Sequence, residues 1–219
     1  MKGLFVTGTD TGVGKTVVSA ALMAAFPGAS YWKPVQSGCD EDDDTATVRN
    51  LSGATPDRCL DRGVRLKLPA SPHHAAEVEG TEIRLSQLLE GAPQERGPWI
   101  VEGAGGLMVP LSRTTILPDL IKALDLPTLI VSSTRLGTIN HTLLTVAAHA
   151  SLGLETVGLV LNGDHDPSAT SGISAHTDVE ILMAIPHRKE LTPDFVRSVG
   201  GRLAQIPALA RLLGGGDTP

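Results

Sequence analysis

The glycine-rich segment at residues 8–16, GTDTGVGKT, constrains the fold more than any other part of the chain. It follows an apolar run at residues 4–6 and precedes a run of small and apolar residues at 17–26. A segment of this kind between a strand and a helix presents backbone N–H groups at the helix N-terminus, where they bind phosphate groups. The chain is therefore predicted to begin with a buried strand, a phosphate-binding loop and a helix.

Apolar runs typical of strands alternate with longer segments of helical pattern along the chain. Most of these runs are apolar on successive residues, as in a parallel sheet that is buried on both faces. Strands are predicted at residues 4–7, 31–35, 99–101, 128–131, 157–161 and 182–185. Helices are predicted at residues 15–26, 45–52, 116–124, 140–152 and 174–182. The alternation predicts an α/β fold with a doubly wound, mostly parallel sheet flanked by helices.

Length and composition favour one domain. With 219 residues, of which 41% are hydrophobic, the chain is long enough for one sizeable core. No stretch is rich enough in proline, glycine and serine to indicate a linker between domains. Residues 1–213 are therefore predicted to form a single domain, and the glycine-rich end at 214–219 a flexible tail.

Composition also limits the cellular location and the binding partners that can be expected. The apolar runs are much shorter than the roughly 20 residues of a membrane-spanning helix. The first apolar run already ends at residues 7–8, which is too early for the apolar segment of a signal peptide. A formal net charge of −6, without a cluster of lysine and arginine, gives no surface for nucleic acid or an anionic membrane. Cys39 and Cys59 lack a metal-ligand pattern and are expected to be reduced thiols. We therefore expect a cytoplasmic protein without a nucleic-acid or membrane partner.

The spacing of the glycine-rich loop differs by one residue from the strict P-loop pattern. That pattern places its first glycine at position 9, where Thr9 stands, whereas the glycine here is Gly8. The groups that carry the chemistry remain, because Lys15 supplies an ammonium for phosphate and Thr16 a hydroxyl for Mg²⁺. A glycine-rich turn that only caps a helix is the alternative. The position of the loop directly after a buried strand favours nucleotide binding.

Carboxylates follow one predicted strand and precede one predicted helix. Glu102 ends the apolar run at the edge where open α/β sheets bind ligands, which makes it a candidate ligand of Mg²⁺. The small residues at 103–106 would let the backbone approach phosphate or substrate; a solvated or capping glutamate is the alternative. The run of five acids at residues 40–44 is interpreted mainly as a solvated loop at a helix N-terminus. Its last member, Asp44, is treated separately below.

Lys33 lies within the apolar segment YWKPV at residues 31–35. An unpaired lysine is costly to bury, and the end of this predicted strand faces the same edge of the sheet as the phosphate-binding loop. Lys33 is therefore expected to direct its charge at an anion bound there. The alternative is an edge-strand lysine in water.

The segment LGTINH at residues 136–141 opens a helical run. Its glycine and threonine would expose backbone N–H groups suited to a carboxylate, although ordinary N-capping explains them equally well. The adjacent His73 and His74 point apart and lack further ligands in pattern, so they do not indicate a metal site. His149 lies on the packed face of the predicted helix and is interpreted as a structural histidine.

Six segments, in order along the chain, resemble the dethiobiotin synthetase family. They are FVTGTDTGVGKT at 5–16, WKPVQSG at 32–38, PASPHHAA at 69–76, VEGAGGLMVPLS at 101–112, LGTINHTLLT at 136–145 and LVLNGD at 159–164. The family's loop has the form GTDTxVGKT, so the displaced glycine belongs to its pattern. The cell-division and plasmid-partition ATPases of the same superfamily carry a signature lysine where this chain has Asp10. The resemblance therefore implies a P-loop NTPase-like fold and argues against those ATPases.

The resemblance also implies a reaction and partners. Members of the family are homodimers that close a cyclic urea from 7,8-diaminononanoate, CO₂ (supplied as bicarbonate) and MgATP in biotin biosynthesis. An amine attacks CO₂ to give a carbamate, the carbamate takes the γ-phosphoryl group, and the neighbouring amine closes the ring and releases phosphate. Positioning and charge stabilisation would carry such a reaction. The substrate pocket is expected at the subunit interface.

Residue roles follow from the positions that match the family. Lys33 and Lys15 would be catalytic, and Thr16, Asp44 and Glu102 would ligate Mg²⁺. The implied nucleotide-binding residues are Gly12, Val13, Gly14, Lys15, Thr16, Val17, Asp44, Glu102, Gly103, Ala104, Gly105, Asn162, Gly163, Ile185, Pro186 and His187. The implied substrate-binding residues are Thr11, Ser37, Gly105, Gly106 and Leu107, with Gly137, Thr138, Ile139 and Asn140 contributed by the partner subunit.

Two other functional classes share parts of this sequence pattern. A P-loop switch ATPase that controls a partner would require an exposed apolar or basic face, and the sequence gives no sign of one. An amide-forming ligase of cobalamin synthesis usually carries a glutamine-hydrolysing domain with a nucleophilic cysteine, and Cys39 and Cys59 lie too early to supply it. One departure from the family pattern is Gly12, which stands where some members carry a glutamate that closes over the nucleotide.

Overall fold

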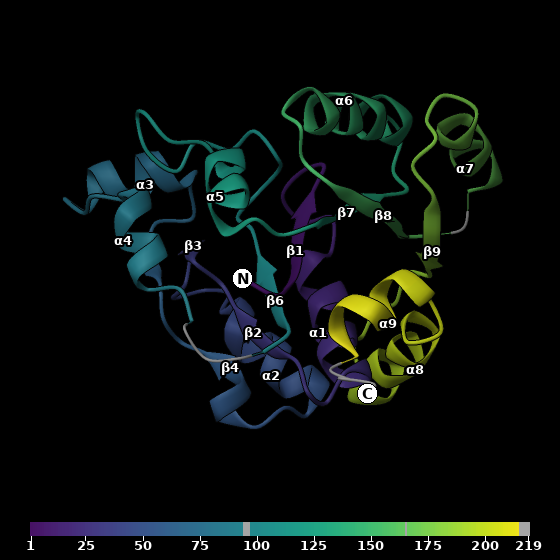
Figure 1. The fold of residues 1–219 in the computed structure, drawn as a ribbon, viewed down its shortest axis with the longest axis horizontal. Coiled ribbons are helices and arrows are strands. Elements are labelled where there is room, and N and C mark those ends of the chain that lie inside the picture. Colours follow the sequence, from purple (N-terminus) through teal and green to yellow (C-terminus); the bar gives the residue numbers. More distant parts are fainter. Residues whose placement is uncertain (94–96, 165, 215–219) are drawn as a thin grey trace.

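A seven-stranded sheet forms the centre of the computed structural model, which describes residues 1–93, 97–164 and 166–214 (Figure 1). Its strands, in spatial order, are β4 (Cys59–Leu60), β2 (Ser30–Trp32), β6 (Trp99–Glu102), β1 (Gly3–Gly8), β7 (Thr128–Ser133), β8 (Thr156–Asn162) and β9 (Ile181–Ile185). Every neighbouring pair runs parallel. Because parallel strands all end at one edge of the sheet, the loops that follow them meet there.

Helices cover both faces of the sheet, which confirms the predicted doubly wound α/β fold (Figure 1). One face carries α1 (Lys15–Ala25), α2 (Asp44–Ser52), α8 (Pro193–Leu203) and α9 (Pro207–Leu213), whose buried side chains share one core with the strands. The other face carries α3 (Pro72–Val78), α4 (Leu85–Glu90), α5 (Leu117–Leu124), α6 (Thr138–Ser151) and α7 (Pro167–Ser174). A short 3₁₀ helix (Pro56–Arg58) precedes β4.

The strand predicted at residues 31–35 is wrong as a single strand. β2 ends at Trp32, and the chain then passes through Lys33 and Pro34 into β3 (Val35–Ser37), which pairs with β5 (Val64–Leu66) in a second, two-stranded sheet. Proline has no N–H for a sheet ladder, so the strand is interrupted where Pro34 stands. Lys33 therefore lies at the junction of the two sheets. The other five predicted strands are confirmed, with boundaries that differ by a few residues.

The helix predicted at residues 174–182 is wrong. The helix of this region, α7, ends at Ser174, and residues 181–185 form β9. α7 starts at a cap that the prediction overlooked, because the Asp166 carboxylate accepts the N–H of Ala169 and Pro167 takes the first helical position. The helices α3, α4, α8 and α9 were not predicted at all.

The described chain ends just after α9. Gly214 donates its N–H to the carbonyl of Ala210 at 2.8 Å, which closes the last turn of the helix. The remainder of the tail predicted at 214–219, residues 215–219, lies outside the described residues. Among the helices of the described ranges, none has both the length and the apolar character needed to cross a membrane.

His149 is fully buried in α6. Its Nδ1 lies 2.7 Å from Thr156 Oγ1, and its Nε2 is buried without a hydrogen-bond partner. Burial lowers the pKa of the imidazole to about 4. The folded protein therefore holds this histidine neutral at a pH where an exposed histidine is charged.

We expect the free energy of unfolding to fall as the pH drops from about 6.5 to about 4. The unfolded chain binds a proton on His149 near its ordinary pKa, whereas the folded chain resists protonation until about 4. This difference is worth up to about 3 kcal/mol. Replacement of His149 by glutamine should remove this part of the pH dependence. Urea titrations at about pH 7 and about pH 4.5 measure it, and equal losses in both proteins would contradict the assignment.

Candidate functional site

The carboxyl ends of β1 and β6 lie side by side and carry two of the predicted groups. Val6 pairs in register with Glu102, so this carboxylate lies beside the point where β1 leads into the glycine-rich loop. α1 begins at Lys15 directly after that loop, with Thr16 and Val17 in its first turn. The fold therefore brings the loop and the strand-end glutamate to one edge of the sheet.

The glycine-rich loop has a backbone suited to phosphate. Gly12 and Gly14 have φ angles of 72° and 96°, a region that favours glycine. Gly14 is the N-cap of α1, and the first turn of a helix leaves backbone N–H groups free for a ligand. Lys15 Nζ donates to the carbonyl of Asp10 at 3.0 Å. Burial lowers the pKa of Lys15 to about 8, although Glu102 acts in the opposite direction.

Lys33, Thr16, Asp44 and Glu102 form one connected cluster. Lys33 Nζ lies 2.5 Å from Asp44 Oδ2 and 2.9 Å from Glu102 Oε1. Thr16 Oγ1 donates to Asp44 Oδ1 at 2.7 Å and lies 3.1 Å from Glu102 Oε1. The side chain of Lys33 is 4% exposed and that of Glu102 is 0% exposed. The alternatives of an edge lysine in water and a solvated glutamate are therefore wrong.

The charges in this cluster stabilise one another. Burial alone would lower the pKa of Lys33, but the carboxylates of Glu102 and Asp44 outweigh burial and raise it. Burial would likewise raise the pKa of Asp44, and the charge of Lys33 with the hydrogen bond from Thr16 lowers it instead. At neutral pH Lys33 is charged and Asp44 is ionised.

The oxygen atoms of the cluster suit Mg²⁺. This ion prefers oxygen ligands and is usually held by one or two carboxylates together with the phosphates of a nucleotide. Asp44 and Glu102 supply two carboxylates, and Thr16 supplies a hydroxyl in contact with both. Within the described ranges, no three His, Cys, Asp or Glu residues gather into a metal site of their own. The donor set therefore fits an ion that binds together with a nucleotide.

The turn after β6 packs against the start of the glycine-rich loop. Gly103 donates its N–H to the carbonyl of Val6 at 2.9 Å, and Leu107 donates to that of Gly8 at 3.1 Å. The turn also contains the predicted residues Ala104, Gly105 and Gly106. The structure thus places the predicted residues at 103–107 beside the loop.

Two predicted substrate residues lie on other elements. A Cβ atom added at Gly105 would lie 3.5 Å from Thr11 Oγ1, so Thr11 lies near the turn after β6. Ser37 ends β3 in the small sheet, and its hydroxyl is buried without a hydrogen-bond partner. A buried hydroxyl without a partner is uncommon and calls for an explanation such as a ligand. Ser37 therefore fits a role in ligand binding.

The residues predicted for a base pocket meet at the ends of β8 and β9. Asn162 pairs in register with Ile185, and Gly163 donates its N–H to the carbonyl of Ile185 at 2.9 Å. Residues 186–187 follow and are exposed. Asn162 Nδ2 also donates to the carbonyl of Val13 at 2.9 Å. Asn162 therefore supports the glycine-rich loop, a contact that the sequence did not indicate.

Residues 137–140 form the N-cap and first turn of α6. They are the segment predicted to bind the carboxylate of the substrate that lies in the partner subunit. A row of hydroxyls joins this end of the helix to the glycine-rich loop. Thr9 Oγ1 donates to Ser132 Oγ at 3.3 Å, and Ser132 Oγ lies 2.9 Å from Thr138 Oγ1. The start of α6 is thereby fixed to the same edge of the sheet as the loop.

The solvated loop predicted for residues 40–43 is confirmed for the first three, whereas the fourth, Asp43, is a helix cap. Residues 40–42 are exposed, as expected of a solvated loop. Asp43 is the N-cap of α2: its Oδ1 accepts the N–H of Ala46, and its Oδ2 lies 2.7 Å from Arg65 Nη2. Asp44 begins the helix and reaches Lys33. The cap fixes where α2 starts and hence where Asp44 lies.

Sequence reasoning missed one residue in contact with the cluster. The hydroxyl of Tyr31 donates to Glu102 Oε2 at 3.1 Å, and both residues are fully buried. No sequence pattern indicated this contact, because it depends on the pairing of β2 with β6.

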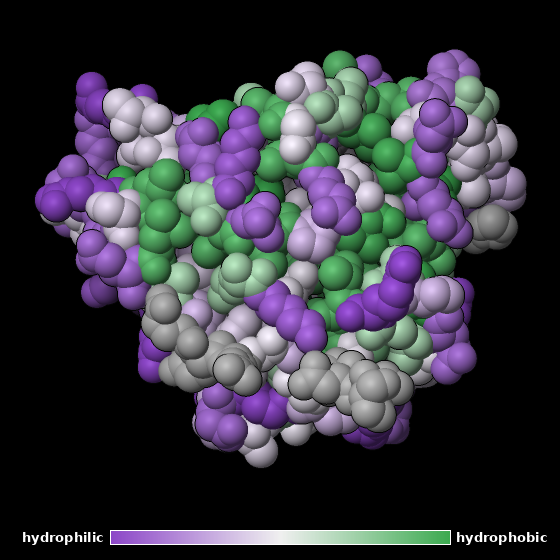
Figure 2. All heavy atoms as spheres, in the orientation of Figure 1, coloured by the Kyte–Doolittle hydropathy of each residue, from purple (hydrophilic) through white to green (hydrophobic). Residues whose placement is uncertain are grey.

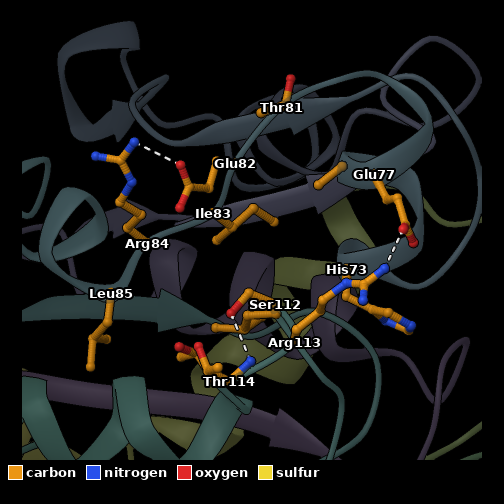
Figure 3. A pocket seen from close by; sticks show the side chains of 13 residues that line it. His73, Glu77, Thr81, Glu82, Ile83, Arg84, Leu85, Ser112, Arg113 and Thr114 are labelled. Carbon is orange, nitrogen blue, oxygen red and sulfur yellow. Dashed lines mark hydrogen bonds and ion pairs between the residues drawn. The ribbon is translucent and has the colours of Figure 1, made fainter.

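A separate hollow lies between α3, the segment leading into α4 and the loop at residues 111–115 (Figure 3). Its volume is about 520 Å³, and none of its lining residues is among those predicted for the site. Its charged side chains pair with one another: Arg113 lies 2.5 Å from Glu77, and Arg84 lies 2.7 Å from Glu82. These pairs are exposed and therefore contribute little free energy.

Comparison with known proteins agrees with this geometry. The family model of the AAA domain matches residues 2–194. An ATP-dependent dethiobiotin synthetase of Nitrobacter hamburgensis is 45% identical over 194 residues, which cover 89% of this chain and 90% of that protein. The enzyme of the same name from Rhodopseudomonas palustris (strain BisA53) is 44% identical over 88% of this chain and 89% of its own. The enzyme of the same name from Brucella suis biovar 1 is 42% identical over 87% of this chain and 89% of its own.

Solved structures share the fold at much lower identity. The cell-division complex MinC:MinD of Aquifex aeolicus matches with a TM-score of 0.58 and 15% identity, over 99% of this chain and 97% of that one. A ParA family ATPase of Chlorobium tepidum matches with a TM-score of 0.55 and 14% identity, over 97% of both chains. These matches confirm the P-loop NTPase-like fold.

Proposed function

The chain belongs to the AAA-domain family and to the family of ATP-dependent dethiobiotin synthetases, and we propose that it closes the cyclic urea of dethiobiotin. The substrates would be 7,8-diaminononanoate, CO₂ from bicarbonate and ATP, and ADP and phosphate would be released. The observation that carries this proposal is the buried cluster of Lys33, Thr16, Asp44 and Glu102 beside a phosphate-binding loop. Such a cluster suits the transfer of a phosphoryl group.

The triphosphate of ATP would be held by the loop and the start of α1. Backbone N–H groups at residues 12–17 and the ammonium of Lys15 are the natural partners of the phosphates. The turn at residues 103–105 would lie on the opposite side of the phosphates from the loop. The base would lie against Asn162, Gly163 and residues 185–187, which meet at the neighbouring strand ends. The contact of Asn162 with Val13 would join the base pocket to the phosphate loop.

Mg²⁺ would be held by Thr16, Asp44 and Glu102 together with the nucleotide. When bound, the ion would neutralise charge on the phosphates and orient the transferred group. The charge of Lys33 already compensates the two carboxylates in the protein alone. Lys33, which follows β2, and Lys15, which begins α1, would both lie close to the phosphates.

The proposed chemistry needs no covalent bond to the protein. One amine of the substrate would attack CO₂ and lose a proton, which forms a C–N bond and a carbamate. The carbamate oxygen would take the γ-phosphoryl group and release ADP. The neighbouring amine would then attack the activated carbonyl, close the ring and expel phosphate. Lys33 would stabilise the negative charge that moves between the carbamate and phosphate oxygens.

The substrate would bind between two subunits of a homodimer. Thr11, Ser37 and residues 105–107 would contact the diamine, and the backbone N–H groups at residues 137–140 of the partner subunit would accept its carboxylate. Exposed apolar side chains near that segment support an interface, because Leu136 is 106% exposed and Leu144 is 61% exposed. Hydrophobic residues also gather on and beneath α6 at the top of Figure 2.

The proposed function is tested by phosphate release from MgATP and bicarbonate, with and without 7,8-diaminononanoate. We expect release that depends on the diamine. Release that instead responds to glutamine or ammonia would indicate an amide-forming ligase, and release that responds to a macromolecular partner would indicate a switch ATPase. Because the proposed reaction consumes ATP, we place it in the cytoplasm.

A further inference from the structure

We propose that Tyr31 is a positioning residue that orients the carboxylate of Glu102. This inference rests on the proposed function in one respect, namely that Glu102 serves the Mg²⁺ that accompanies the nucleotide. Tyr31 lies in β2 and Glu102 ends β6, and both are 0% exposed. The hydroxyl of Tyr31 donates to Glu102 Oε2 at 3.1 Å.

The pairing of β2 with β6 places the two side chains together. Tyr31 pairs in register with Ile100, which lies two residues before Glu102 on the same face of the strand. Tyr31 and Ile100 pack in the core that α1 covers, whereas Trp32 and Val101 pack in the core on the opposite face. The contact of Tyr31 with Glu102 is therefore a diagonal pair across two parallel strands, fixed by backbone register.

The two oxygens of Glu102 have different partners. Oε1 accepts from Lys33 Nζ at 2.9 Å and lies 3.1 Å from Thr16 Oγ1, whose proton goes to Asp44. Oε2 accepts from Tyr31. The carboxylate cannot rotate about its Cγ–Cδ bond without losing this hydrogen bond. Tyr31 thereby keeps Oε1 directed at the residues that would hold the phosphates and the metal ion.

A tyrosine can hold this oxygen without adding charge. A tyrosine phenol is a neutral hydrogen-bond donor at neutral pH, so its contact with Oε2 adds no charge to the cluster. The negative charge of Glu102 stays available to Lys33 and to a bound cation. Groups that orient a metal ligand in this way commonly change metal affinity by about 10- to 100-fold when they are removed.

The test compares Tyr31→Phe with Trp32→Phe in the full chain. Trp32 is the matched control because it is also fully buried and donates one hydrogen bond, to the carbonyl of Arg62, from the opposite face of β2. Calorimetry would measure the affinity for a non-hydrolysable ATP analogue in EDTA, and then the affinity for Mg²⁺ in the presence of the analogue. For Tyr31→Phe we expect an about 10- to 100-fold loss of Mg²⁺ affinity. The affinity for the analogue without metal should be unchanged.

Several outcomes would overturn the inference. A folded Tyr31→Phe protein with the Mg²⁺ affinity of the wild type would do so, and so would an equal loss in Trp32→Phe, which would show general loosening of β2. Wild-type protein that binds neither the analogue nor Mg²⁺ with it would instead overturn the proposed function.

A second measurement keeps Tyr31 in place and labels it. The sequence contains 1 tyrosine, so incorporation of 3-fluorotyrosine gives one ¹⁹F resonance, from Tyr31. We expect that resonance to shift when Mg²⁺ is added to the complex with the ATP analogue, and the shift to be lost in Glu102→Gln. A resonance that does not respond while calorimetry shows Mg²⁺ binding would contradict the positioning role.

Discussion

Replacement of Lys33 by alanine is expected to lower kcat by about 10²- to 10⁴-fold, while the affinity for ATP changes by only a few-fold. The physical reason is the place of Lys33 in the cluster. Its ammonium lies within 2.9 Å of both Asp44 and Glu102, at the junction of the two sheets. A buried cation there would stabilise the charge that develops during phosphoryl transfer more than the charge of bound ATP. Single-turnover kinetics and calorimetry with an ATP analogue would separate the two effects.

The same substitution should also destabilise the protein. It leaves the buried charges of Asp44 and Glu102 without their cation, a change that commonly costs about 3 to 5 kcal/mol. Turnover must therefore be measured at a temperature where the variant is folded. Lys122→Ala, at an exposed position on α5, is the control for a lost lysine charge. Equal losses of turnover and ATP affinity in Lys33→Ala would show that Lys33 acts by binding the ground state.

Substitution of Gly14 by alanine is expected to weaken the binding of an ATP analogue by at least about 100-fold. The φ angle of Gly14 is 96°, which is unfavourable for a residue with a Cβ by about 1–2 kcal/mol. The added Cβ would also lie 1.9 Å from Asn162 Nδ2. The side chain of Asn162 would have to move away, and its hydrogen bond to the carbonyl of Val13 would be lost. Both changes distort the loop that would hold the phosphates.

Gly12→Ala supplies the matched control. Gly12 also has a positive φ angle, 72°, but a Cβ there would meet nothing within 4 Å. This variant carries the conformational cost alone, so we expect it to lose about 10-fold in affinity for the analogue. Equal losses in the two variants would show that the contact of Gly14 with Asn162 is unimportant for the loop.

The sequence indicated much of the site because a parallel sheet brings the carboxyl ends of all its strands to one edge. Once a parallel sheet is inferred from the apolar runs, Lys15, Glu102 and Lys33 must all lie near its carboxyl edge, whichever strand each belongs to. The residue types then identify the site, because a glycine-rich loop together with a strand-end carboxylate is typical of phosphate and metal binding. The fold class and the main cluster were predictable for this reason.

Contacts between side chains were not predictable. The sequence shows Lys33 near an edge, but not that one ammonium joins Asp44 to Glu102. It also gives no sign that Asn162 reaches the carbonyl of Val13, across 149 positions of sequence. Such contacts depend on strand order, and β1 lies between β6 and β7 although β6 follows it by about ninety residues.

The unpredicted helix α8 shows a second limit. Its sequence, PDFVRSVGGRL, contains two adjacent glycines, which lower the helix propensity of the segment. Packing explains the first of them, because a Cβ at Gly200 would lie 2.6 Å from the carbonyl oxygen of Ala21 in α1. The glycine that weakens the local signal therefore permits the close approach of two helices. Tertiary packing, rather than propensity, stabilises α8.

The central claim is most directly tested by following the carbon atom of bicarbonate. Purified protein would be incubated with MgATP, ¹³C-bicarbonate and 7,8-diaminononanoate, and the products analysed by mass spectrometry while phosphate is counted. The account predicts dethiobiotin carrying a single ¹³C in its urea carbonyl, with one phosphate released for each molecule formed. Phosphate release without labelled dethiobiotin, or release indifferent to the diamine, would contradict it.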